Sequence, residues 1–140
     1  NIIYLSKETI FTGTLKDNLI LKNDKNIKKL INICQLRELI DKNPLGLHMF
    51  LEENGQNIST GQKQRVSLAR SLYNFDILLI DEALSGLDIN LERKILKNLF
   101  KEFNNKIIIV VTHRLDNLDL FDQYMKFKEG KIVINEKRKE

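Results

Sequence analysis

Two apolar segments, residues 75–81 and 107–111, most constrain how this chain can fold. Each is short, bounded by polar residues and rich in Ile, Leu or Val, which is typical of a strand covered on both faces. Between them, apolar residues recur at helical spacing: Leu91, Ile95, Leu96, Leu99 and Phe103. This pattern predicts a helix over 90–103. Strand, helix and strand in this order predict a right-handed crossover between parallel strands, and therefore an α/β fold.

The rest of the chain predicts shorter elements. In order, we expect a strand at 2–5, a turn at 11–14 into a short helix, helical periodicity at 26–41 with a break, a loop at 43–46, a helix over 60–73, and a closing hairpin of 124–128 and 132–134.

Composition narrows the functional classes. The 140 residues are 42% hydrophobic and 30% charged with a net charge of +4, as in a compact globular domain. Because charges of both signs are interspersed, a nucleic-acid surface is disfavoured. The apolar run at 107–111 is far shorter than the roughly 20 residues that span a bilayer. A single cysteine, Cys34, excludes an internal disulfide and is expected in the core.

Residues 59–65, Ser-Thr-Gly-Gln-Lys-Gln-Arg, open the predicted helix over 60–73. Ser59 stands at the N-cap, and Gly61 permits close approach to the backbone. The N–H groups of a first helical turn, together with the positive end of the helix dipole, favour an anion. From Ser59 and Gly61 alone, an ordinary capped helix is the alternative.

Carboxylates and a histidine follow the two central strands. Asp81 and Glu82 end the first strand, and because adjacent strand residues point to opposite sides, the two acids can have different tasks. His113 follows the second strand within Thr-His-Arg-Leu. Taken singly, the acids could cap the next helix, and the histidine could be a capping or surface residue.

In this order and spacing, these segments resemble the C-terminal half of the ATP-binding domain of ABC transporters. Residues 58–65 are similar to the signature motif, with Thr60 in place of a glycine. Residues 77–82 are similar to the Walker B motif, 83–88 to the D-loop, and His113 to the switch histidine. The resemblance implies a partial P-loop NTPase fold. Residues 14–74 would form the helical signature subdomain, and 75–140 would carry the remaining motifs.

The resemblance also implies roles. Asp81 would hold Mg²⁺ through water, Glu82 would act as general base on the attacking water, and His113 would bind the γ-phosphate. The signature residues would contact ATP held by a second subunit, and D-loop residues would lie between the subunits. The signature residues are Ser59, Gly61 and Gln62, and the D-loop residues are Ser85 and Asp88.

Two features depart from the family pattern. The Q-loop glutamine position falls on Ser6 or Lys7, neither of which is an amide, and no Gly-x-x-x-x-Gly-Lys-Ser/Thr motif is present. Without that Walker A motif, these 140 residues alone are expected to show no ATPase activity. Because the chain starts with Asn1, we expect it to be an excised segment. We also expect it to self-associate through an apolar edge of the 75–81 strand.

The resemblance therefore implies an ATP-binding and hydrolysing part of an exporter that uses ATP and Mg²⁺ at the cytoplasmic face of the cell membrane. Its partners would be the transmembrane domain and a second, identical or different ABC ATPase domain, not nucleic acid. Residues 11–14 and 44–46 favour exporters, with peptide and bacteriocin exporters as the narrower hypothesis. The alternatives are a truncated or degenerate ABC module that binds a partner without hydrolysis, and a nucleic-acid-linked ABC ATPase.

Overall fold

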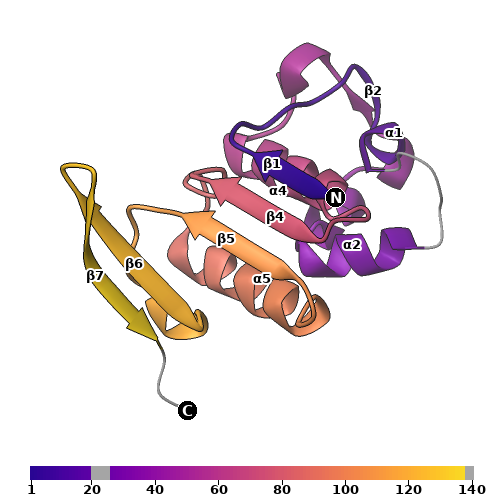
Figure 1. Cartoon of the computed structure of the whole chain (residues 1–140). Helices are drawn as coiled ribbons and strands as arrows, with labels where there is room; N and C mark the ends of the chain where they lie inside the picture. Colours follow the sequence, from indigo (N-terminus) through magenta and orange to yellow (C-terminus); the bar gives the residue numbers. More distant parts are fainter. Residues whose placement is uncertain (20–25, 138–140) are drawn as a thin grey trace.

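A three-stranded parallel sheet forms the centre of the molecule (Figure 1). The computed structural model describes residues 1–19 and 26–137. The strand order is β1 (Ile2–Leu5), β4 (Ile77–Asp81), β5 (Ile107–Val111), and β4 pairs in parallel with both neighbours. Helix α5 (Ile89–Glu102) connects β4 to β5. The predicted strand–helix–strand unit and the α/β class are thus confirmed.

The two longest helices begin at the residues that their sequence indicates. Helix α4 (Thr60–Ser71) has Ser59 as its N-cap, and α5 has Asp88, whose carboxylate accepts a hydrogen bond from the Leu91 N–H at 2.9 Å. Figure 1 shows both helices on one side of the sheet. Their inward residues meet Leu78 and Ile80 of β4, which are fully buried.

Smaller elements surround this centre. They are β2 (Gly13–Thr14), α1 (Leu15–Leu19), α2 (Ile27–Ile33), α3 (Arg37–Asp41), β3 (Phe50–Leu51), and three 3₁₀ turns at Gly46–His48, Glu53–Gly55 and Leu118–Leu120. The predicted helical break within 26–41 falls at Gln35, whose φ is +53°. Cys34 is buried as expected, and this burial raises the pKa of its thiol.

The closing hairpin consists of β6 (Gln123–Lys128) and β7 (Lys131–Lys137), as the sequence predicts. Glu129 and Gly130 connect them, both with positive φ, which is the backbone that a two-residue hairpin turn requires. In the part of the chain that the structure describes, no helix is long and apolar enough to cross a bilayer.

The prediction that both central strands are covered on both faces was wrong. Ile107, Ile109 and Val111 of β5 are 56%, 48% and 46% exposed. The helices cover only one face, and alternate strand residues point to the other face. The strand register places Ile2, Tyr4, Ile77, Leu79 and Asp81 on that same open face. The prediction that the 75–81 strand exposes an apolar edge was also wrong, because β4 lies between β1 and β5 and is therefore not an edge strand.

The open face predicts how the isolated chain behaves. We expect the 140 residues to self-associate at roughly micromolar to millimolar concentrations, because contiguous apolar surface is exposed. Ile109→Thr should lower the associated fraction in sedimentation velocity. Ile89→Thr is the matched control, because Ile89 is similarly exposed but lies on α5. A monodisperse monomer without substitution would contradict this expectation.

Candidate functional site

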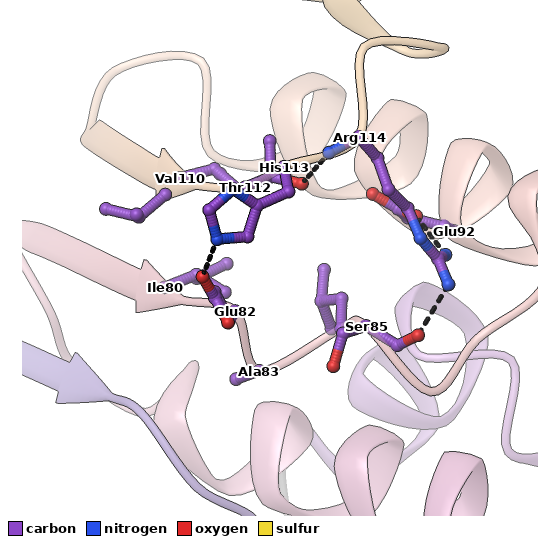
Figure 2. Close-up of a pocket in the computed structure, with 11 residues that line it drawn as sticks. Ile80, Glu82, Ala83, Ser85, Glu92, Val110, Thr112, His113 and Arg114 are labelled. Atoms are coloured by element: carbon purple, nitrogen blue, oxygen red, sulfur yellow. Dashed lines mark hydrogen bonds and ion pairs between the residues drawn. The ribbon is translucent and has the colours of Figure 1, made fainter. Parts of the chain in front are cut away.

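The carboxyl ends of β4 and β5 bring Glu82 and His113 together (Figure 2). The parallel register pairs Asp81 with Val111, so the residues that follow the two strands lie side by side. Glu82 Oε1 lies 2.6 Å from His113 Nε2. The His113 side chain is 89% exposed and that of Glu82 is 49% exposed, so both are open to a ligand from solvent.

The backbone of Glu82 directs its side chain away from the line of the strand. Its φ is +53°, a left-handed conformation that non-glycine residues seldom adopt. Two hydrogen bonds hold it there: the Glu82 N–H donates to the Val111 carbonyl at 3.0 Å, and the Ser85 N–H donates to the Glu82 carbonyl at 3.1 Å. Strained backbone of this kind concentrates at functional sites.

A cavity adjoins this pair. The ends of β4 and β5 line it with Ile80 and Val110, the loop after β4 lines it with Ser85, and α5 contributes Glu92 (Figure 2). The cavity therefore combines an apolar back with carboxylate, imidazole and hydroxyl groups. Such a combination suits a site that orients a polar ligand at the edge of a parallel sheet.

The Asp81 side chain points in a different direction from the Glu82 side chain. It lies on the open face of the sheet, where its carboxylate accepts a hydrogen bond from the Tyr4 hydroxyl at 2.7 Å, and it does not line the cavity. This hydrogen bond raises the pKa of the Tyr4 phenol. The two neighbouring acids are thus available for separate tasks. Among the described residues no cluster of three or more potential metal ligands is found, so Asp81 suits Mg²⁺ only as a single carboxylate whose ion is otherwise held by water and phosphate.

The predicted signature residues cap their own helix. The Ser59 hydroxyl accepts from the Gln62 N–H at 3.2 Å, and the Gln62 side-chain oxygen accepts from the Ser59 N–H at 2.8 Å. This reciprocal pair is a capping box. The capped-helix alternative therefore describes these two side chains, while a contact with nucleotide phosphate remains a prediction for them.

The start of α4 also contacts the loop between β4 and α5. A Cβ on Gly61 would lie 3.3 Å from the Gly86 carbonyl oxygen and 3.2 Å from a methyl group of Leu87. The Gln64 side-chain oxygen accepts a hydrogen bond from the Gly86 N–H at 2.9 Å. The loop between β4 and α5 of the same chain therefore packs closely against Gly61, and this contact was not predicted from the sequence.

The remaining predicted residues lie around this region. Asp88 caps α5, and Ser85 lies in the loop at the edge of the cavity. Ser6 and Lys7 follow β1 and are exposed. Because Leu5 pairs with Ile80, Ser6 comes next to Asp81 in the register, and Lys7 lies one residue beyond.

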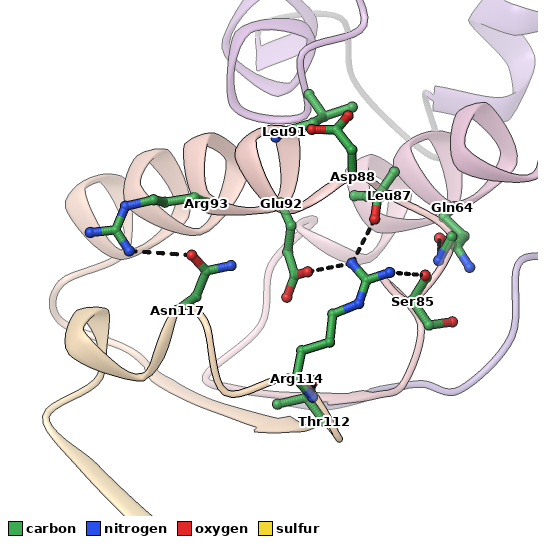
Figure 3. Close-up of polar contacts among 11 residues, drawn as sticks. Gln64, Ser85, Leu87, Asp88, Leu91, Glu92, Arg93, Thr112, Arg114 and Asn117 are labelled. Atoms are coloured by element: carbon green, nitrogen blue, oxygen red, sulfur yellow. Dashed lines mark hydrogen bonds and ion pairs between the residues drawn. The ribbon is translucent and has the colours of Figure 1, made fainter.

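An ion pair that was not predicted from the sequence lies beside the cavity. Arg114 Nη1 lies 2.8 Å from a carboxylate oxygen of Glu92, whose side chain is only 5% exposed (Figure 3). A signal for it was present in the sequence, because Glu92 shares the inward stripe of α5 with Ile95 and Leu99. A carboxylate in such a stripe requires a partner when it is buried.

Known proteins resemble the chain along most of its length, although no family model matches it. A mesentericin-Y105 transport/processing ATP-binding protein of Leuconostoc mesenteroides is 38% identical over 140 residues, covering 95% of this chain. The lactococcin-A transport/processing ATP-binding protein of Lactococcus lactis is 37% identical over 139 residues, covering 94%. A glutathione/L-cysteine transport system ATP-binding/permease protein of Haemophilus influenzae is 33% identical over 130 residues, covering 89%.

The chain is homologous to ABC export ATP-binding proteins. The predicted resemblance is thereby confirmed, including the relation to bacteriocin exporters. The chain spans only 19% of the length of the Lactococcus and Leuconostoc relatives and 23% of the length of the Haemophilus relative.

Proposed function

We propose that this chain is part of the ATP-hydrolysing domain of an ABC exporter and supplies the general base and the histidine of its active site. The observation that carries the proposal is the 2.6 Å contact between Glu82 and His113 at the ends of adjacent parallel strands. The sequence similarity to ATP-binding export proteins supports the choice of ATP as substrate.

In this proposal, different side chains of the chain have separate roles in ATP hydrolysis. Glu82 accepts the proton of the water that attacks the γ-phosphate, and its left-handed backbone aims the carboxylate towards His113. Before ATP binds, the His113 Nε2–H orients that carboxylate, and in the loaded site the same N–H is available to a phosphate oxygen. Asp81, on the open face, would hold Mg²⁺, which when bound neutralises charge on the phosphate oxygens.

The signature segment would serve a second ATPase domain. The twelve-residue helix α4 begins at residues 59–62, and the positive pole of its dipole lies at this N-terminus, where a phosphate is favoured. We propose that Ser59, Gly61 and Gln62 meet the nucleotide of that second domain, identical or different in sequence, and that Ser85 and Asp88 lie between the two domains.

We further propose that the complete protein contains or binds a transmembrane domain and acts at the cytoplasmic face of the cell membrane. The names of its relatives, which are export and transport ATP-binding proteins, support this proposal. Peptides are the proposed class of cargo, because two of these relatives transport bacteriocins, lactococcin A and mesentericin Y105.

The chain's two histidines provide a matched test of the function. In the full-length polypeptide that carries this chain, we expect His113→Ala to lower the kcat for ATP hydrolysis by about 10²- to 10³-fold, the usual effect of losing one preorganised donor. His48→Ala should leave kcat unchanged, because His48 is exposed and lies outside the cavity. Steady-state phosphate release measures both.

Two outcomes would contradict the proposal. Equal turnover by the two histidine variants would remove His113 from the reaction. A full-length protein that binds partners but hydrolyses no ATP would favour the non-hydrolysing ABC module instead.

A further inference from the structure

We infer, on the basis of the proposed ATPase function, that Arg114 is a positioning residue that fastens the loop of residues 83–88 to the segment carrying His113. Glu82 immediately precedes this loop, and Arg114 immediately follows His113. Arg114 thereby keeps the two sides of the proposed catalytic pair in one arrangement without itself lying between them.

The guanidinium group of Arg114 reaches two elements at once (Figure 3). Nη1 donates to the Leu87 carbonyl oxygen at 2.6 Å and to the Glu92 carboxylate at 2.8 Å. Nη2 donates to the Ser85 carbonyl oxygen at 2.5 Å. Two of these acceptors belong to the loop and the third belongs to α5, so a single side chain joins both to the end of β5.

A backbone hydrogen bond of Arg114 fixes the segment that carries His113. The Arg114 N–H donates to the Thr112 hydroxyl at 3.0 Å, which holds the backbone on both sides of His113 in a tight turn. Glu82 is joined to the same strand through its N–H and the Val111 carbonyl. The route from imidazole to loop and back to carboxylate is therefore continuous through named hydrogen bonds.

Arginine suits this position better than lysine. Its planar fork presents several N–H groups in fixed directions, whereas a lysine ammonium is a single point of charge. Here the guanidinium group donates to the Glu92 carboxylate and to the carbonyl oxygens of two different loop residues. Lysine could retain the ion pair with Glu92 but could not reproduce the pair of carbonyl contacts at Ser85 and Leu87.

The first experiment is Arg114→Lys in the full-length protein. We expect kcat to fall by about 10- to 100-fold, because small displacements of catalytic groups have effects of this size. The KM for ATP should stay within about twofold and the thermal midpoint close to wild type, because the charge facing Glu92 is kept. Arg93→Lys is the matched control: Arg93 pairs with the exposed Asp119 and should keep wild-type turnover.

The second measurement does not depend on turnover. Hydrogen exchange at the amides of Ser85 and Leu87, which bond to the Glu82 and Leu84 carbonyls, reports on the loop directly. Arg114→Lys should accelerate exchange there and leave the amides of Leu96 and Leu99 in α5 unchanged.

Each result of these two experiments either supports or overturns the positioning role of Arg114. Wild-type kcat, unchanged loop exchange, or a loss of turnover that only follows a lowered melting temperature would overturn the positioning role. If the unsubstituted full-length protein hydrolyses no ATP, the proposed function fails. Faster loop exchange in Arg114→Lys would then still support the fastening, and unchanged exchange would refute it.

Discussion

Glu82→Gln in the full-length protein is expected to lower the kcat for ATP hydrolysis by about 10²- to 10⁴-fold, the usual contribution of a general base. Glutamine has the same shape but cannot accept the proton of the attacking water. The substitution should preserve the fold, since the hydrogen bonds of Glu82 to Val111 and Ser85 use only its backbone. The amide oxygen can also still accept from the His113 N–H.

Steady-state turnover at saturating ATP and Mg²⁺ measures this effect, and nucleotide binding should remain close to wild type. Glu129→Gln is the matched control, because Glu129 also has a positive φ and an exposed side chain but lies in the β6–β7 turn. Turnover by Glu82→Gln equal to that of this control would exclude Glu82 as the base.

Arg114→Leu is expected to destabilise the domain by about 1–3 kcal/mol, the range for leaving a buried polar group without its partner. It leaves the Glu92 carboxylate, 5% exposed, without its cationic partner and takes a donor from the Ser85 and Leu87 carbonyls. The double variant Arg114→Leu with Glu92→Leu should regain much of this loss, because no charge is then left buried.

Thermal unfolding of the full-length protein tests this prediction. Lys42→Leu is the reference, since Lys42 and Glu38 form an exposed i,i+4 pair of the kind worth about 0.3–0.5 kcal/mol. Equal melting temperatures for Arg114→Leu and Lys42→Leu would show that the pairing of Arg114 with Glu92 stabilises the domain no more than an exposed ion pair does.

Local patterns were sufficient to predict most elements. The apolar runs at 77–81 and 107–111, the helical spacing in α5, and the turn residues Glu129 and Gly130 each act within a few neighbouring residues. The Ser59 N-cap was predicted for the same reason, because a capping side chain bonds to backbone only three residues away.

Contacts between distant segments could not be predicted in this way. Nothing local indicates that Tyr4 bonds to Asp81, that Gln64 bonds to Gly86, or that the Glu92 carboxylate meets Arg114. Likewise, an apolar strand has the same sequence whether one or both of its faces are covered, so the open face of β5 was not foreseen.

By itself, the sequence determined the α/β class, the order of strands and helices, and the candidate carboxylates and histidine, because these depend on residue type and spacing. Only the tertiary structure decided that Glu82 and His113 touch and that Asp81 bonds to Tyr4 on the open face of the sheet. The physical reason is the parallel register of β4 and β5 together with the left-handed backbone at Glu82, which set side-chain directions that no run of neighbouring residues specifies.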